Sequence, residues 1–126
     1  MKNRVVIPTN IDGVNVYEIG EAAFRNKGIT NVTIYKGIEK VGYAAFQGNK
    51  IDTVKLSMTV KEVDDYAFYK SKRKTLIMSE GIEFIGEYAF ANNNICSVSF
   101  LASLKELGAF ACLLIIVLQK YLFQQG

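Results

Sequence analysis

The residues with the most obvious chemistry in this sequence are two pairs of acids. Asp64 is followed directly by Asp65, and Glu80 lies three residues before Glu83. Two neighbouring carboxyl groups can divide the work of a general acid and a general base. The sequence has no histidine to join them, however, and it has neither a GxSxG motif nor a glycine-rich phosphate-binding loop. We therefore predict no catalytic residues and no enzymatic activity, and we interpret the acids as surface positions.

The two cysteines do not indicate a metal site. Cys96 and Cys112 are too far apart for a CxxC motif, and without histidine no zinc site of the Cys/His type can form. Cys96 is next to a core position of an expected strand, which favours a buried free thiol. A disulfide between the two cysteines is the alternative. We expect no metal ion and no cofactor.

Positive charge is the third source of chemistry in the sequence. Lys70, Lys72, Arg73 and Lys74 form a small basic cluster, which predicts a solvated loop or, as the alternative, a contact with an anion or an acidic partner. The chain has 126 residues, 50% of them hydrophobic, and its net charge is only +3. This balance gives no electrostatic reason to expect nucleic acid or an anionic membrane surface as a partner.

Neither end of the sequence has the pattern of an export or membrane signal. The first eight residues lead into a strand pattern and a proline, without an apolar segment and a small-residue cleavage site. The longest apolar run, Leu113 to Leu118, is far shorter than the ~18 residues that a transmembrane helix requires. As it stands, the chain is expected to be soluble and cytoplasmic, with no transmembrane segment.

All these side chains are set on a regular internal repeat. The phenylalanine of an Ala-Phe pair recurs at residues 24, 46, 68, 90 and 110, in steps of 22, 22, 22 and 20 residues. A fixed period in this range is typical of a solenoid, because one unit cannot bury its own apolar face and must stack on its neighbours. The phenylalanines are expected to form a stacked ladder in the shared core.

Other columns of the repeat predict one strand and one tight corner in each coil. Apolar and polar residues alternate in 32–34, 54–56, 76–78 and 98–100, which predicts strands that pair in parallel from coil to coil. A second column, in which four of five residues are glycine, indicates a backbone with positive φ or a close approach of two backbones. Its Asp64 favours positive φ, because Asp tolerates that region better than most residues. The column consists of Gly20, Gly42, Asp64, Gly86 and Gly108.

The two ends of the repeat array differ from its centre. Asp12-Gly13 between apolar residues predicts a hairpin-like insertion in the first unit. At the other end an apolar run replaces the polar turn of the earlier units. We divide the single domain, residues 1–126, into a cap-like first repeat at 1–28, regular repeats at 29–50, 51–72 and 73–94, and a shortened last repeat with an apolar cap at 95–126.

The consensus Ile-x-x-Val-x-Ile-x-x-x-Ile-x-x-Ile-Gly-x-x-Ala-Phe-x-x-Asn-x resembles the BspA-type leucine-rich repeat, found mainly in bacterial surface proteins and in some parasitic protists. The resemblance covers residues 4 to about 110. It implies a β-rich α/β solenoid of about five 22-residue coils, with a parallel sheet on the concave face and short turns or 3-10 segments on the convex side. It also implies adhesion to host or neighbouring-cell proteins, or an intracellular partner for a chain that is never exported. Family members are usually longer and exported, so a fragment of a longer surface protein is an alternative.

The first functional hypothesis is a non-enzymatic protein-binding module. Residues that alternate with the core on the concave strands are free to contact a partner. The alternative is that β propensity alone selected them. The candidate partner-binding residues, of which the first three are the expected anchors, are Tyr35, Lys55, Ile77, Thr33, Ser99, Thr53 and Thr75.

The second functional hypothesis is a structural scaffold that forms a homo-oligomer through its C-terminal end. An apolar tail leaves a large exposed patch unless a partner or the solenoid itself covers it. Packing back on the solenoid as a cap is the alternative. The residues of this candidate surface are Leu114, Ile116, Leu118, Leu122 and Phe123.

Overall fold

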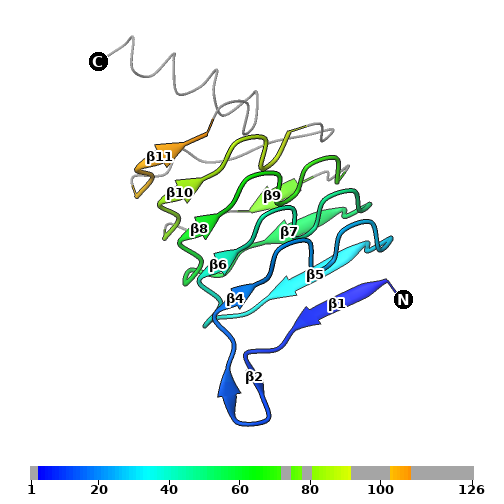
Figure 1. The fold of residues 1–126 in the computed structure, drawn as a ribbon, viewed down its shortest axis with the longest axis vertical. Coiled ribbons are helices and arrows are strands. Elements are labelled where there is room, and N and C mark those ends of the chain that lie inside the picture. The colour runs from blue at the N-terminus through cyan, green and yellow to red at the C-terminus, as the bar shows by residue number, and fades with distance from the viewer. Residues whose placement is uncertain (1–2, 72–74, 78–80, 92–102, 109–126) are drawn as a thin grey trace.

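The computed structural model describes residues 3–71, 75–77, 81–91 and 103–108. Within these ranges the chain is a solenoid whose coils stack along one axis, and successive coils add strands to two separate parallel sheets (Figure 1). The predicted β-rich solenoid is therefore confirmed. The described ranges contain strands and turns but no helix, so the helical component of the expected fold is not found in them.

The first sheet contains the strands that the alternating pattern predicts. In the described residues it has four strands, β1 (Arg4–Ile7), β5 (Asn31–Ile34), β7 (Thr53–Lys55) and β9 (Thr75–Ile77), in that order. The register follows the 22-residue period, because Val32 pairs with Val54 and Val54 pairs with Leu76. The fourth strand predicted from alternation, at 98–100, lies outside the described residues.

A second parallel sheet lies on the other side of the core, where the sequence predicted turns. We call it the five-stranded sheet and the first one the four-stranded sheet. Each of its strands has two residues, of which the first is outward-facing and the second packs towards the core. The strands, from one edge to the other, are β11 (Glu106–Leu107), β10 (Phe84–Ile85), β8 (Glu62–Val63), β6 (Lys40–Val41) and β4 (Glu18–Ile19).

The predicted phenylalanine ladder is the centre of the core. Phe24 stacks on Phe46 at 5.3 Å between ring centroids, Phe46 on Phe68 at 5.2 Å, and Phe68 on Phe90 at 5.5 Å. The rings are within 9° of parallel. Phe46 and Phe68 are fully buried together with the isoleucine and valine columns. One side chain repeated at one position thus ties each coil to the next.

From Gly42 onward, the glycines of the column allow close packing of the backbones of successive coils, and the prediction of positive φ at Asp64 was wrong. Left-handed φ values of 52–59° occur two residues later, at Ala22, Ala44, Tyr66 and Tyr88. Ala22, Ala44 and Tyr66 keep that conformation because their backbone N–H groups bond to the next coil, as when Ala44 donates to the Asp65 carbonyl at 3.0 Å. At Gly42, in contrast, a Cβ would overlap the carbonyl of Ile19 in the preceding coil.

This close approach predicts that alanine destabilises the protein at Gly42 but not at the equivalent Gly20. Gly42→Ala should destabilise the protein by about 1–3 kcal/mol, because the added methyl group forces two coils apart. Gly20→Ala is the matched control, since a Cβ at Gly20 would meet nothing within 4 Å. Urea unfolding of both variants measures the effect. Equal stability of the two variants would contradict the close-approach explanation.

The insertion in the first unit is a hairpin, as predicted. Strands β2 (Asn10–Ile11) and β3 (Val14–Asn15) pair antiparallel through Asp12 and Gly13, whose φ values of 51° and 84° suit a two-residue type I′ turn. The hairpin projects beyond the first coil (Figure 1). Its Ile11 and Val14 side chains are exposed.

The turns after the phenylalanines hold the only buried polar side chains recorded in the described ranges, Asn49 and Ser71. The Asn49 amide nitrogen donates to the carbonyls of Phe24 and Phe46, both at 2.8 Å. Its oxygen accepts from the backbone N–H groups of Lys27 and Ile29, both at 3.0 Å. In the next turn the Ser71 hydroxyl donates to the Phe46 carbonyl at 2.8 Å. Asn49 therefore connects two turns that have no strand pairing of their own.

Candidate functional site

Several of the predicted binding residues form a row across the outer face of the four-stranded sheet. Val6 pairs with Thr33, Thr33 with Lys55, and Lys55 with Ile77, so these positions lie side by side on four successive strands. Val32 and Ile34, which flank Thr33, are buried. Thr33 therefore faces outward, as alternation predicts. Val6 is 52% exposed and Lys55 is exposed.

A depression of about 370 Å³ lies beside the two central positions of this row, towards the C-terminal ends of β5 and β7. It brings together three of the predicted residues, Thr33, Tyr35 and Lys55. The Tyr35 side chain is 54% exposed. Lys36 lines the same depression but was not among the predicted binding residues. Its position directly after Tyr35 could have identified it from the sequence. The remaining lining residues are Val32, Ile34 and Ser57.

Hydrogen bonds between coils fix the corner that carries Tyr35 and Lys36. The Ser57 hydroxyl donates to the Tyr35 carbonyl at 3.1 Å. The Thr59 hydroxyl accepts from the Gly37 N–H at 2.9 Å and donates to the Ile38 carbonyl at 2.8 Å. Residues 35–38 are thus bonded at several points to the next coil. The depression therefore has a rigid backbone frame, which lowers the entropy cost of binding.

The other predicted residues are only partly placed. Thr53 pairs with Thr75 in β7 and β9, and Ile77 takes its register position in β9. Ser99 lies outside the described residues. So do Cys96 and Cys112, the basic residues 72–74, and the whole candidate oligomer surface of Leu114, Ile116, Leu118, Leu122 and Phe123. What the sequence predicts for these residues therefore stays a prediction.

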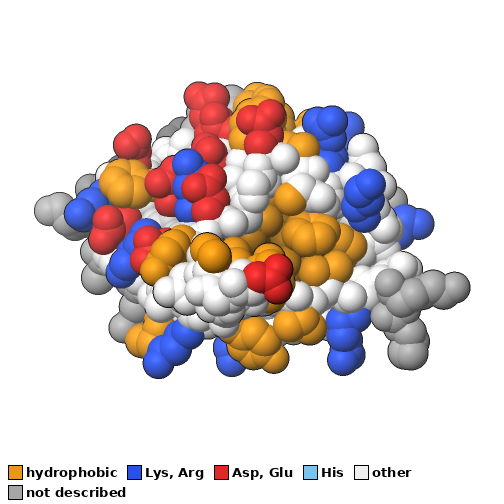
Figure 2. All heavy atoms as spheres, turned by 60° about the horizontal axis from the view of Figure 1, so that its bottom comes forward, with side chains coloured by type: hydrophobic (Ala, Val, Ile, Leu, Met, Phe, Trp, Pro, Cys, Tyr) orange, Lys and Arg blue, Asp and Glu red, His pale blue; other side chains and the backbone are white. Residues whose placement is uncertain are grey.

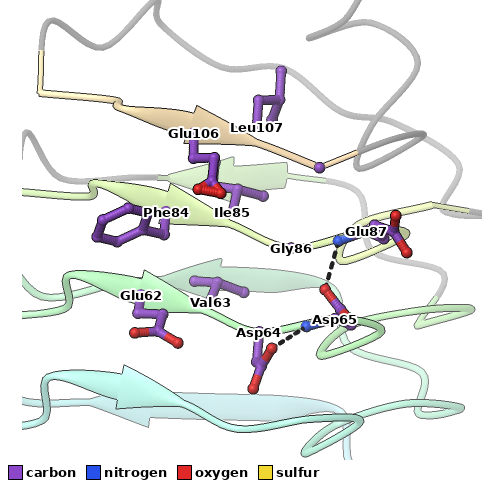
Figure 3. A pocket seen from close by; sticks show the side chains of 11 residues that line it. Glu62, Val63, Asp64, Asp65, Phe84, Ile85, Gly86, Glu87, Glu106 and Leu107 are labelled. Carbon is purple, nitrogen blue, oxygen red and sulfur yellow. Dashed lines mark hydrogen bonds between the residues drawn. The ribbon is translucent and has the colours of Figure 1, made fainter.

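A second depression, of about 430 Å³, lies on the five-stranded sheet and is rich in carboxylates (Figure 3). Asp64 accepts a hydrogen bond from the Asp65 N–H, and Asp65 accepts one from the Glu87 N–H in the next coil, both at 2.8 Å. These acids therefore hold the backbone of their corners. In the described ranges no group of three or more acidic, cysteine or histidine residues is arranged to bind a metal ion.

Lysine neutralises part of this acidic face. Lys40 Nζ lies 3.3 Å from a Glu62 oxygen and 3.8 Å from an Asp64 oxygen. Its hydrogen bond with Glu62, and the attraction of that carboxylate, raise the pKa of Lys40. Lys40 thus neutralises part of the charge of two carboxylates on this face.

A cluster of tyrosine rings lies at the corner that follows the five-stranded sheet. Tyr66 stacks on Tyr88 at 5.2 Å, and Tyr69 meets Tyr66 edge-on at 5.1 Å. Tyr43 approaches the Tyr66 ring at 5.9 Å. Burial among these rings, followed by the influence of Tyr88, raises the pKa of Tyr66. The rings of this cluster thus pack against one another from coil to coil.

Figure 2 shows the end of the solenoid that carries the hairpin. Acidic and basic side chains are mixed on one side of this view, whereas Lys and Arg side chains stand without acidic neighbours along the opposite side. Hydrophobic side chains show between them. The protein thus has no uniform charge on this face.

In the ranges that the structure describes, no helix has the length and apolar character needed to cross a membrane.

Comparisons with known proteins identify the repeat. The profile of the BspA-type leucine-rich repeat region matches residues 4–114 in six copies. The crystal structure of a leucine-rich repeat protein from T. pallidum is similar, with a TM-score of 0.80 and 26% sequence identity. The match covers 86% of this chain and 53% of the T. pallidum chain, so this chain spans about half the length of that protein. No curated protein matches the sequence. The 22-residue coils, the phenylalanine ladder and the profile match agree, and the chain belongs to the BspA-type leucine-rich repeat family.

Proposed function

We propose that this protein is a non-enzymatic binding module whose protein partner contacts the outer face of the four-stranded sheet, at the depression around Tyr35 and Lys55. The observation that carries the proposal is the convergence of Thr33, Tyr35 and Lys55 on one depression with a hydrogen-bonded frame. Exposed tyrosine is among the residues most enriched in protein interfaces. Solenoids of this kind offer an extended surface for binding and are typically scaffolds without catalytic groups.

The family supports a more specific setting for this binding. BspA-type repeats are found mainly in bacterial surface proteins, so adhesion to a host or neighbouring-cell protein is the biological role that we propose. The alternative role, as an oligomerising scaffold, depends on residues 114–123, which lie outside the described residues.

Selection of phage-displayed random peptides on the immobilised protein tests the binding site. We expect a class of clones that loses affinity by about tenfold or more when Tyr35→Ala and Lys55→Ala are combined, which corresponds to about 1.4 kcal/mol of binding energy. The matched control combines Phe84→Ala and Lys61→Ala, two exposed positions in or beside the five-stranded sheet. These clones should bind the control variant as they bind the original protein. Clones that bind both variants equally well would place the binding surface elsewhere.

A further inference from the structure

We propose that the depression on the four-stranded sheet takes an acidic segment of the partner, in which aspartate or glutamate flanks an apolar side chain. This inference rests on the proposed function and adds the chemistry of the partner to it. Its evidence is the kind of charge at the depression, the apolar surface beside that charge, and the spacing between the two.

Within the described ranges, the charge at the depression is positive and no carboxylate compensates it. None of the described residues that line the depression carries a carboxylate. Two lysines, Lys36 and Lys55, line it, and both are exposed. Neither lysine forms an ion pair with any acid in the described ranges. Lys40 on the opposite face, in contrast, is paired with Glu62 and Asp64. A carboxylate from a partner would therefore meet two ammonium groups that form no ion pair with the described part of the chain.

The surface beside these lysines is apolar and exposed. The Tyr35 side chain is 54% exposed. Its ring makes no stacking contact with another ring in the described part of the chain. Val6, which pairs with Thr33 and is 52% exposed, extends the same face towards β1. An apolar side chain placed here would remove surface from water that the protein itself leaves uncovered.

The spacing suits a short segment that crosses the strands. Val6, Thr33 and Lys55 lie in register on three adjacent strands, so Val6 and Lys55 are separated by two strand spacings, or about 10 Å. An extended chain covers that distance in about three residues. One short acidic segment can thus place an apolar side chain near Tyr35 and Val6 and a carboxylate near the lysines. Because the backbone at Tyr35 is already fixed by Ser57, little ordering is required on binding.

The experiment uses the peptide clones that depend on this face. The first readout is their sequence, which should be enriched in aspartate and glutamate over the unselected library. The second is binding to a variant with Lys36→Glu and Lys55→Glu, which should lose about tenfold or more in affinity. The matched control combines Lys27→Glu and Lys61→Glu, which changes the net charge equally at two exposed lysines elsewhere. It should bind the same clones nearly as well as the original protein.

A salt titration of the unmodified protein adds a readout that needs no variant. Affinity for an acidic clone should fall as sodium chloride rises from about 0.1 M to about 1 M, because the screening length shortens from about 10 Å to about 3 Å. If the clones that depend on Tyr35 and Lys55 proved to be neutral or basic peptides, the inference would be overturned and the proposed function would stand. Equal losses in the two charge-reversed variants would also overturn it, because the attraction would then be unspecific. The absence of any face-dependent clone would overturn the proposed function itself.

Discussion

Phe68→Ala should lower the free energy of unfolding by about 3–5 kcal/mol, the cost of removing a large aromatic ring from a packed core. The Phe68 side chain is fully buried and lies between Phe46 and Phe90, with ring centroids 5.2 Å and 5.5 Å away. Its loss opens a gap in the middle of the ladder, which neither neighbouring ring can fill without leaving its own coil. Equilibrium unfolding in urea measures the change.

The chain contains a matched control for this substitution. Phe84 is 38% exposed on the outer side of β10, and Phe84→Ala should cost about 1 kcal/mol or less. Both variants remove the same ring, so the difference between them reports burial alone. A similar loss in the two variants would mean that the ladder is not the main source of cohesion between the coils.

Asn49→Ala should destabilise the protein by about 2–4 kcal/mol, although it removes only a short polar side chain from a turn. The Asn49 amide satisfies two carbonyls and two N–H groups of neighbouring turns, and it is 1% exposed. Alanine would leave the Phe24 carbonyl and the Lys27 and Ile29 N–H groups without the Asn49 amide as partner, whereas the Phe46 carbonyl would keep its hydrogen bond from Ser71. The cost of such unsatisfied groups exceeds the value of the hydrogen bonds themselves.

Asn31→Ala is the control for this prediction. Asn31 is half-buried at the start of β5 and makes no side-chain hydrogen bond within the described ranges. Its replacement should change stability by about 0.5 kcal/mol or less. If Asn49→Ala were as mild as Asn31→Ala, water would have to replace the amide at the turn, and the asparagine would not hold the coils together.

The solenoid, its period and three of the four predicted strands were readable from the sequence because each follows from a repeated local pattern, and the hairpin followed from Asp12-Gly13 between apolar residues. The five-stranded sheet was not, since strands of two residues are too short to show an alternation of period two. Positive φ was predicted at Asp64 but occurs at Ala22, Ala44, Tyr66 and Tyr88. There the pairing between coils overrides the usual preference of Ala and Tyr, and no propensity could reveal this.

The candidate site was predicted in part. The 22-residue period placed Thr33 beside Lys55, and alternation turned both outward, so their proximity followed from the sequence. The sequence identified the turns after the phenylalanines as polar, but it could not show that the Asn49 side chain is buried in the interior. Lys36 was missed since a strand pattern gives no information about the corner that follows the strand. The depression itself depends on that corner.

Chemical-shift mapping of the isotope-labelled protein, titrated with a face-dependent peptide, tests the binding surface most directly. We predict that the largest amide shifts occur at Thr33, Tyr35 and Lys55 and at neighbouring residues of β5 and β7. Largest shifts on the opposite face instead, around Glu62 and Phe84 in β8 and β10, would contradict the proposal that the four-stranded sheet binds the partner.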